Sequence, residues 1–560
     1  MVFNFRKKKQ KPIEIYPDEI FLDSKNIPQF DVYQFEGRIE KPIGKRTFIT
    51  MTVFFIMVGI FFVGELFSIQ ILEGKTLRER SEKNSLRIDY ILANRGIIFD
   101  RNGETLAWNE PDARLYIDWN GLSHVLGYVG LPSEEDLQKI DNLPLKQILG
   151  KDGIEKRYND ILGGKPGMKI VETDVENNII SESIQNHPEE GKNIKLTIDA
   201  KLQSQFFNIM ESVMKDRGFH GGSGIIINVN NGEILSLVSC PEYDSEILSK
   251  GEPEEKIMEF LNDANKPFLN RVIAGLYAPG SIIKPLIAIA ALNENIISSQ
   301  KQIFSAGYIS IPNPFFPDKQ SIFKDWKTHG WIDMRKAIAV SSDVYFYEIG
   351  GGFEEQRGLG IKKIEDYTKL FGLDSLTGVD LYGEEIGIVP NPDLKEKFEP
   401  NDPIWRIGDT YNASIGQGYF QVTPVEMAIY ASAIANKGKI IKPHLILEDN
   451  IQDYTLRSLN ISEDYFNIIH EGMRLSVKEG TASALNVFGA EIAAKTGTAE
   501  IGAGKKYVNS WVIGFFPYDH PQYAFAVVME KGPSANLVGS PYVIRQLIDW
   551  MTIYTPQYLK

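Results

Sequence analysis

The hydrophobic and polar positions of the chain first change pattern at Thr47. Residues 47–64 carry no charge and are mostly Phe, Ile, Val and Met, and the apolar run resumes over 66–72. A run of this length predicts a single helix over 47–72 that spans a membrane. A buried core helix and a cleaved signal peptide are the alternatives. A signal peptide would not normally follow a polar stretch such as 1–46, and no small-residue cleavage site follows the run.

Basic residues gather on the N-terminal side of this span. They are Arg6, Lys7, Lys8, Lys9, Lys11, Lys45 and Arg46. The positive-inside rule then puts the N-terminus in the cytoplasm and everything after about residue 72 outside. Mixed charge and scattered prolines predict a flexible cytoplasmic tail over 1–46. We therefore expect a single-pass protein of the cytoplasmic membrane with its larger part outside.

The chain that follows the span shows no pattern of a catalytic site up to about residue 200. Apolar runs on both sides of Asp100-Arg-Asn-Gly103 predict a β-hairpin, since Asn-Gly is a strong turn signal. Arg95, Asp100 and Arg101 could be functional, but we expect them to form a structural ion-pair cluster that braces this hairpin. Short helical pieces and glycine-rich turns fill 131–187. We interpret 73–200 as an elongated, non-catalytic pedestal module.

Residues 201–560 predict an α+β domain. Two apolar strands flank an Asn-Asn-Gly turn within 224–239, and three more strands are expected over 490–498, 508–516 and 523–530, before a helical pattern over 541–554. Strands at both ends with helices between them indicate an antiparallel sheet, flanked by helices, that joins the two ends of the domain.

Composition narrows the functions that the chain can have. Its 560 residues are too many for one ordinary domain, and a net charge of −14, without a basic stripe interleaved with aromatic residues, argues against a nucleic-acid partner. Cys240 is the single cysteine, so neither a disulfide framework nor a thiolate zinc site can form. We expect Cys240 to be a small buried residue.

The segment Tyr277-Ala-Pro-Gly-Ser-Ile-Ile-Lys-Pro285 carries the first candidate chemistry. If it opens a helix, Ser281 and Lys284 lie on one face within hydrogen-bond reach. A serine hydroxyl needs an adjacent base, and a lysine amine that has lost its proton can serve. Ser281 is thus the candidate nucleophile and Lys284 its base. The same spacing occurs three more times, at Ser212/Lys215, Ser298/Lys301 and Ser321/Lys324, so spacing alone is weak.

Two further motifs lie downstream of Ser281 in a fixed order. Ser341-Ser-Asp343 places a hydroxyl that can relay a proton and a carboxylate that can orient a lysine on one loop. Lys495-Thr-Gly-Thr498 occurs once, at the end of an apolar strand. There Lys495 supplies positive charge, the hydroxyls of Thr496 and Thr498 can hold a carboxylate, and Gly497 lets a substrate backbone approach the strand. The aromatic run after Asp343, residues 345–347, is more often core packing than a groove lining.

These three motifs resemble those of the class B high-molecular-weight penicillin-binding proteins, and the chain is most similar to their elongation-type subgroup, penicillin-binding protein 2. The resemblance covers nearly everything from residue 47 onward. Besides the motifs it includes Arg95-Gly-Ile-Ile-Phe-Asp-Arg-Asn-Gly103, Leu196-Thr-Ile-Asp199, Asn270-Arg271 and Gly408-Asp-Thr-Tyr-Asn-Ala-Ser-Ile-Gly-Gln-Gly-Tyr419. Asp343 replaces the asparagine common across the superfamily, as in the elongation subgroup. Ile282 departs from the small residue usual after the nucleophile, a change that bears on acylation rate more than on mechanism.

The resemblance implies a β-lactamase-like serine transpeptidase domain that performs peptidoglycan D,D-transpeptidation. Ser281, deprotonated by Lys284, would attack the carbonyl between the two terminal D-alanines of a stem peptide, with the oxyanion held by the backbone N–H groups of Ser281 and Thr498. Ser341 would pass a proton to the departing D-alanine, whose carboxylate Lys495 and the two threonines would hold. β-Lactams should acylate Ser281 and remain attached.

The resemblance also implies partners. No glycosyltransferase module is visible before the catalytic domain, so a separate membrane glycosyltransferase of the shape, elongation and division family is expected, together with other elongation-complex proteins. No cofactor is implied. Some relatives carry zinc beside the second motif, and Asp325 and His329 could be remnants of that site. The cysteine that such a site uses is missing here, so we expect no metal.

Three alternatives keep the site but change its use. A D,D-carboxypeptidase or β-lactamase would use water as the acceptor, but the membrane anchor and the long module argue against both. A β-lactam sensor or inactive scaffold would acylate without releasing D-alanine. A division-type transpeptidase shares all three motifs, and Gly408-Asp-Thr410 with Ser341-Ser-Asp343 favours the elongation type.

Overall fold

The computed structural model describes residues 44–111, 113–140, 143–174, 178–313, 315–316, 318–448, 453–502, 504, 506–536 and 538–560. The chain divides into two compact units, Met1–Arg87 with Val171–Ser181, and Ile88–Ile170 with Glu182–Lys560. Most of the predicted tail, 1–43, lies outside the described residues.

The first unit contains the predicted membrane helix. Helix α1 (Lys45–Phe67) runs into a π-helical turn, Ser68–Leu72, and α2 (Gly74–Ser85) follows. Among the described residues, Lys45–Leu72 is the one helix long and apolar enough to cross a membrane, by length and composition. Its side chains are exposed along almost its whole length, as lipid-facing residues would be. The helix predicted over 47–72 is therefore confirmed.

The second unit opens with the predicted hairpin. Strand β2 (Ile98–Phe99) pairs antiparallel with β3 (Thr105–Glu110), and a four-stranded sheet of order β4-β3-β2-β9 is completed by β4 (Ala113–Tyr116) and β9 (Ile194–Lys195). The other strands before α7 are β1 (Leu86–Ile91), β5 (Val129–Gly130), β6 (Leu149–Gly150), β7 (Gly167–Thr173) and β8 (Ile179–Asn186), and the helices are α3 (Ser123–Leu126), α4 (Glu134–Lys139), α5 (Gly153–Arg157) and α6 (Asn159–Leu162).

The predicted ion-pair cluster in the hairpin is wrong, because its members bind different parts of the chain. Arg95 and Arg114 both bind the buried carboxylate of Glu155, the latter at 2.8 Å. Asp100 alone braces the turn, accepting hydrogen bonds from the backbone N–H groups of Asn102 and Glu104. The Arg101 side chain instead forms an ion pair of 3.2 Å with Glu233 and donates to the Thr197 carbonyl. The side chains of Arg95, Asp100 and Arg101 therefore bind different partners and form no common ion-pair cluster.

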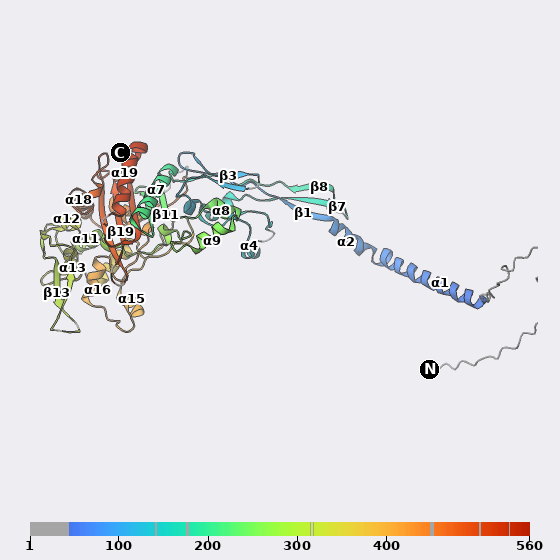
Figure 1. Cartoon of the computed structure of the whole chain (residues 1–560), viewed down its shortest axis with the longest axis horizontal. Helices are drawn as coiled ribbons and strands as arrows, with labels where there is room; N and C mark the ends of the chain where they lie inside the picture. Colours follow the sequence, from blue (N-terminus) through green and yellow to red (C-terminus); the bar gives the residue numbers. More distant parts are fainter. Residues whose placement is uncertain are drawn as a thin grey trace, which may run out of the picture. The chain divides into compact units, whose positions relative to one another are not determined.

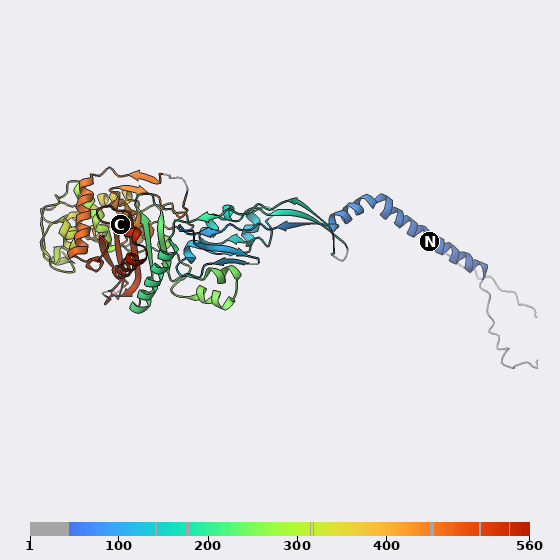
Figure 2. The ribbon, with the colours of Figure 1, turned by 90° about the horizontal axis from the view of Figure 1, so that it is seen from above.

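A five-stranded antiparallel sheet joins the two ends of the catalytic region, as the sequence predicts. Its order is β11-β10-β20-β19-β18. The strands are β10 (Gly221–Asn228), β11 (Ile234–Cys240), β18 (Ala493–Ile501), β19 (Tyr507–Phe516) and β20 (Tyr523–Pro533). In Figures 1 and 2 the green strands β10 and β11 lie beside the red strands from the C-terminal end of the chain. Cys240 is buried at the end of β11, as expected.

Helices cover both faces of this sheet because its strands alternate two sets of apolar side chains. On β10, Ile226 packs with residues of α7 (Ala200–Arg217) and α19 (Ser540–Tyr554), whereas Ile225 and Ile227 face the opposite side. That side is covered by α17 (Pro424–Ala435) and α18 (Glu463–Glu479), and α11 (Lys284–Asn293) packs against α18. The buried helix α11 carries Lys284 at its first position, so the core fixes one end of the site.

The segment between α11 and α12 forms short strand pairs that sequence analysis did not predict. Strand β12 (Ile303–Ser305) pairs with β15 (Gly330–Ile332), and β13 (Tyr308–Pro312) with β14 (Gln320–Lys324). Helices α12 (Met334–Val340) and α13 (Asp343–Gly351) follow. The remaining elements are α8 (Ser245–Lys250), α9 (Glu254–Asn262), α10 (Arg271–Ala274), α14 (Gly360–Leu370), α15 (Pro392–Phe398), α16 (Ile407–Ser414), β16 (Lys439–Ile441) and β17 (Thr455–Ser458).

Candidate active site

Ser281 lies in a 3₁₀ turn, Gly280–Ile283, and α11 begins directly after it. Sequence analysis expected one helix through both residues. The 3₁₀ turn still agrees with the expected pairing of the two residues. Side chains three residues apart eclipse each other in a 3₁₀ helix, which puts Ser281 and Lys284 on one side. Ser281 lines a cleft of about 1080 Å³ together with residues of the two other motifs: Ser341, Asp343, Thr496, Gly497 and Thr498.

The turn that carries Ser281 is held from two sides. The Gly280 N–H donates to the Gly416 carbonyl at 2.9 Å, and the Trp511 indole N–H donates to the Ala278 carbonyl at 3.0 Å. A Cβ on Gly416 would lie 2.2 Å from the Gly280 carbonyl oxygen, so only glycine permits this contact. Gly280 itself has φ +57°, a left-handed conformation that favours glycine. Gly416 was predicted only as part of the segment 408–419, with no role of its own.

Lys284 is fully buried, and its Nζ donates hydrogen bonds to the second motif. Its Nζ lies 2.7 Å from the Asp343 carboxylate, 2.7 Å from the Ser341 carbonyl oxygen and 3.3 Å from the Ser341 hydroxyl. The Phe346 ring centroid is 5.5 Å away. The contact with Asp343 agrees with the expected role of that carboxylate in orienting a lysine.

Ser341 adopts a left-handed conformation, φ 59° and ψ 40°, between the end of α12 and the start of α13. Such a conformation is strained for a residue other than glycine and persists only where the surroundings impose it. The Ser341 hydroxyl accepts a second hydrogen bond, of 2.8 Å, from Lys495. Two lysines from different motifs therefore converge on one hydroxyl.

Lys495 enters this cluster from strand β18 and is also fully buried. Besides Ser341 it donates to the Thr496 carbonyl at 2.8 Å. Burial, and then the nearby Lys284 cation, hold the pKa of Lys495 well below its usual value, and the Asp343 carboxylate only partly opposes this. The site thus places a weakly held proton next to Ser341.

Gly497 on β18 lies in close contact with the turn that carries Ser281. A Cβ there would lie 2.9 Å from both the Pro279 carbonyl oxygen and the Ile282 side chain. The space that a Cβ would take is therefore filled by the turn that carries Ser281. Gly497 also lines the cleft, and the expected approach of a substrate backbone stays a prediction. Thr498, next along β18, is exposed in the cleft.

Thr481 is a cleft residue that sequence reasoning missed. Its hydroxyl lies 2.6 Å from that of Thr496, although it belongs to the segment between α18 and β18. No local pattern marks Thr481, because its partner, Thr496, lies on strand β18, further along the chain. The side chain of Trp326, which also lines the cleft, was missed for the same reason.

The aromatic run after Asp343 is mainly core, as expected. Tyr345 and Phe346 are fully buried in the large apolar core, and Tyr347 is almost fully buried while one part of it lines the cleft. Asp325 and His329 lie 3.7 Å apart at their nearest side-chain atoms. Within the described part of the chain, no three His, Cys, Asp or Glu side chains gather as metal ligands would. The absence of a metal stays a prediction.

Comparison with known proteins matches two family models. One, described as the penicillin binding protein transpeptidase domain, covers residues 222–549, and the other, the penicillin-binding protein dimerisation domain, covers residues 112–196. A protein of Acinetobacter baumannii named peptidoglycan D,D-transpeptidase MrdA is 32% identical over 446 residues. That alignment covers 75% of this chain and 63% of the relative's length.

Two solved structures share the fold over most of the chain. PBP2 of Pseudomonas aeruginosa, solved in complex with WCK 5153, has a TM-score of 0.72 and 30% identity, and the match covers 85% of this chain and 98% of that one. PBP2 of Helicobacter pylori, solved in complex with MreC, has a TM-score of 0.72 and 26% identity, with 84% and 99% of the two chains covered.

Proposed function

The chain belongs to the penicillin-binding protein transpeptidase family, and from that membership and the cleft geometry we propose that it is an elongation-type peptidoglycan D,D-transpeptidase. In this proposal it cross-links stem peptides through a serine acyl-enzyme and is acylated by penicillin. The observation that carries it is the convergence of Lys284 and Lys495 on the Ser341 hydroxyl, in the cleft that Ser281 lines. The elongation role is supported by the names of the relatives, MrdA and PBP2.

In the acylation step, neutral Lys284 takes the proton of the Ser281 hydroxyl as its oxygen bonds to the carbonyl carbon between the two terminal D-alanines. Backbone N–H groups of Ser281 and Thr498 stabilise the oxyanion, a type of donor worth about 10²–10³ in rate. The C–N bond then breaks. A proton reaches the departing D-alanine amine through Ser341, which Lys284 and Lys495 hold in place.

The D-alanine carboxylate is bound by Lys495, Thr496 and Thr498. Of these, Thr496 and Thr498 line the cleft, and Lys495 precedes Thr496 on β18. In the second step, an amine from a neighbouring stem peptide attacks the ester and gives a proton to Lys284. The bond to the Ser281 oxygen breaks, and Lys284 passes that proton to the serine oxygen.

The membrane arrangement and the domain division belong to the same proposal. The tail 1–46 lies in the cytoplasm, 47–72 crosses the membrane, 73–200 forms the pedestal and 201–560 the transpeptidase domain outside. The match to the dimerisation model within the pedestal supports this division. A membrane glycosyltransferase and elongation-complex proteins are the partners, and the solved complex of the Helicobacter pylori relative with MreC supports the latter.

Release of D-alanine from a stem pentapeptide tests the proposal. The full-length chain in detergent, with an acceptor amine and with or without its glycosyltransferase partner, should release D-alanine together with cross-linked product. Free tetrapeptide without cross-link would instead indicate a carboxypeptidase. Labelling by penicillin without D-alanine release under either condition would indicate a sensor and contradict the proposal.

A further inference from the structure

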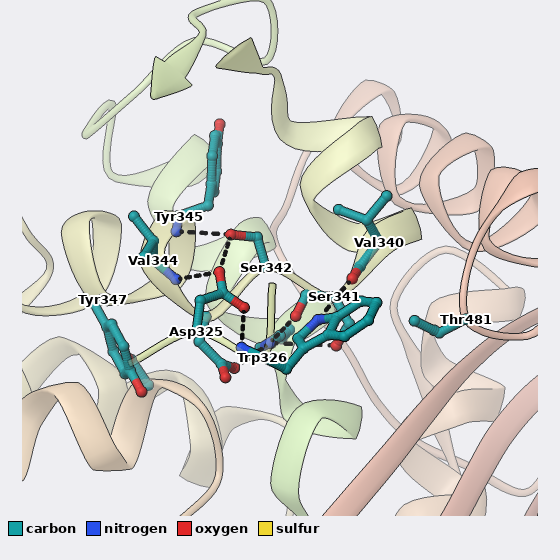
Figure 3. Close-up of polar contacts among 12 residues, drawn as sticks. Asp325, Trp326, Val340, Ser341, Ser342, Val344, Tyr345, Tyr347 and Thr481 are labelled. Atoms are coloured by element: carbon teal, nitrogen blue, oxygen red, sulfur yellow. Dashed lines mark hydrogen bonds and ion pairs between the residues drawn. The ribbon is translucent and has the colours of Figure 1, made fainter. Parts of the chain in front are cut away.

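Asp325 lies outside the three motifs, yet it binds the backbone around the second one (Figure 3). Its side chain is fully buried, directly after the end of β14. One carboxylate oxygen accepts hydrogen bonds from the Ser342 hydroxyl at 2.7 Å, the Val344 N–H at 3.1 Å and the Ser305 hydroxyl at 3.2 Å. The other accepts the N–H of Trp326 at 2.8 Å. Every one of these partners is a donor.

Asp325 therefore acts as an additional cap on α13. The first N–H groups of a helix have no partner within the helix and favour a carboxylate. Here the Ser342 hydroxyl accepts from the Tyr345 N–H, while Asp325 takes the Val344 N–H and holds the Ser342 hydroxyl itself. Helix α13 begins with Asp343, so this cap fixes the residue that binds Lys284.

The next residue holds the other side of Ser341. The Trp326 indole N–H donates to the Val340 carbonyl at 3.2 Å, the residue just before Ser341 (Figure 3). Asp325 and Trp326 thus bind the chain after and before Ser341, which has a strained, left-handed conformation. A strained conformation persists only where contacts from the surrounding residues hold it.

We propose that Asp325, with Trp326, is a positioning clamp that holds Ser341 and Asp343 in register with the two lysines. This inference rests on the proposed function. The clamp sets the rate of the proton-transfer steps and contributes little to ligand binding, because the groups that bind the ligand carboxylate lie on β18. No metal is needed for this role, since N–H and O–H donors occupy both carboxylate oxygens.

Asp325→Asn tests the clamp, because the amide keeps the shape but turns one acceptor into a donor that faces N–H and O–H donors. Asp333→Asn is the matched control: Asp333 caps the neighbouring helix α12 through the Lys336 N–H at 2.9 Å and belongs to none of the three motifs. Acylation of the full-length chain by a fluorescent penicillin is followed over a range of concentrations, which separates the saturating rate from the half-saturating concentration.

We expect Asp325→Asn to lower the saturating acylation rate by about tenfold or more, as misplacement of catalytic groups does, with the half-saturating concentration within about threefold of wild type. Asp333→Asn should stay within about twofold in both. Trp326→Phe removes the indole N–H but keeps the aromatic wall, and should lower the saturating rate by a smaller factor. If Asp325→Asn does not fold, the saturating acylation rate of Trp326→Phe tests the proposal, and a rate equal to wild type would overturn it.

A saturating rate of Asp325→Asn equal to wild type, or an equal loss in Asp333→Asn, would overturn the clamp while leaving the proposed function intact. A shift confined to the half-saturating concentration would also overturn it. A wild-type chain that is not acylated at all would overturn the proposed function itself, and the clamp with it.

Discussion

The Nζ of Lys495 lies 2.8 Å from the hydroxyl oxygen of Ser341, and the two residues are 154 positions apart in the chain. The Nζ of Lys284 approaches the same oxygen to 3.3 Å, and Asp343 is the carboxylate that neighbours both lysines. Two buried amines beside one carboxylate form a site that disfavours a second positive charge. In this arrangement it is Lys495 whose pKa is held well below its usual value, by burial and by the nearby Lys284 cation.

Lys495 should make folding stability depend on pH. Its pKa is lowered in the folded chain and returns to about 10.4 on unfolding. Between these two values the unfolded chain binds more protons, so stability contributed at this site rises with pH, by at most ~1.4 kcal/mol per pH unit. We expect the free energy of unfolding of Lys495→Met, relative to wild type, to fall as the pH rises toward 10. Urea titrations at each pH measure it, and a difference that does not vary with pH would contradict the prediction.

Gly497→Ala should impair acylation by displacing the turn of Ser281. The added Cβ would lie 2.9 Å from a backbone carbonyl of that turn, which cannot rotate away as a flexible side chain can. A displacement of the reacting groups on this scale costs on the order of 10²-fold in rate. Gly130→Ala is the control, since its Cβ would meet only the flexible Lys151 side chain at 3.4 Å. Equal penicillin acylation rates for both variants would show that the turn tolerates the methyl group.

Thr481 should act through the hydroxyl of Thr496. Thr481→Val removes the 2.6 Å hydrogen bond while keeping the volume, and loss of such a bond costs about 1 kcal/mol, or roughly fivefold in acylation efficiency. Thr481→Ser should retain the bond and most of the efficiency. The comparison is made on second-order rates with a β-lactam, and a valine variant as fast as the serine variant would refute the role of the hydroxyl.

Glu155 should be essential for the stability of the pedestal. It is fully buried between Arg95 and Arg114, so Glu155→Gln leaves two buried guanidinium groups without a countercharge. Removing one partner from such a cluster costs about 3–5 kcal/mol. Glu189→Gln, which breaks a highly exposed pair with Lys165, should cost less than about 1 kcal/mol. Chemical unfolding measures both, and similar losses in the two variants would contradict the argument.

The main sheet of the catalytic region could be predicted because its signals are local. The apolar runs around the Asn-Asn-Gly turn gave β10 and β11, and the three C-terminal strands and α19 were placed to within a few residues. Short strands such as β12 and β15 were missed, because three residues carry too little periodicity to distinguish them from loops.

The site was predictable as a set of motifs but not as a geometry. Ser281, Lys284, Ser341, Asp343 and Lys495 were identified by resemblance, and the distances between them could not be. Thr481 and Gly416 were not predicted, and Asp325 was considered only as a remnant of a zinc site, because each acts on a residue that the fold brings near from another segment. Arg95 and Asp100 were wrongly grouped for the converse reason, since residues close in sequence can bind different parts of the fold.

The central claim, that Ser281 is the nucleophile, is tested most directly by covalent labelling. Full-length wild type, Ser281→Ala and Ser298→Ala are treated with a fluorescent penicillin, and the labelled peptide is identified by mass spectrometry. Ser298 is a suitable control because it has the same spacing to a lysine, Lys301, but is exposed and does not line the cleft. We expect a penicilloyl group on Ser281 in wild type and in Ser298→Ala, and none in Ser281→Ala. Undiminished labelling of Ser281→Ala would contradict the account.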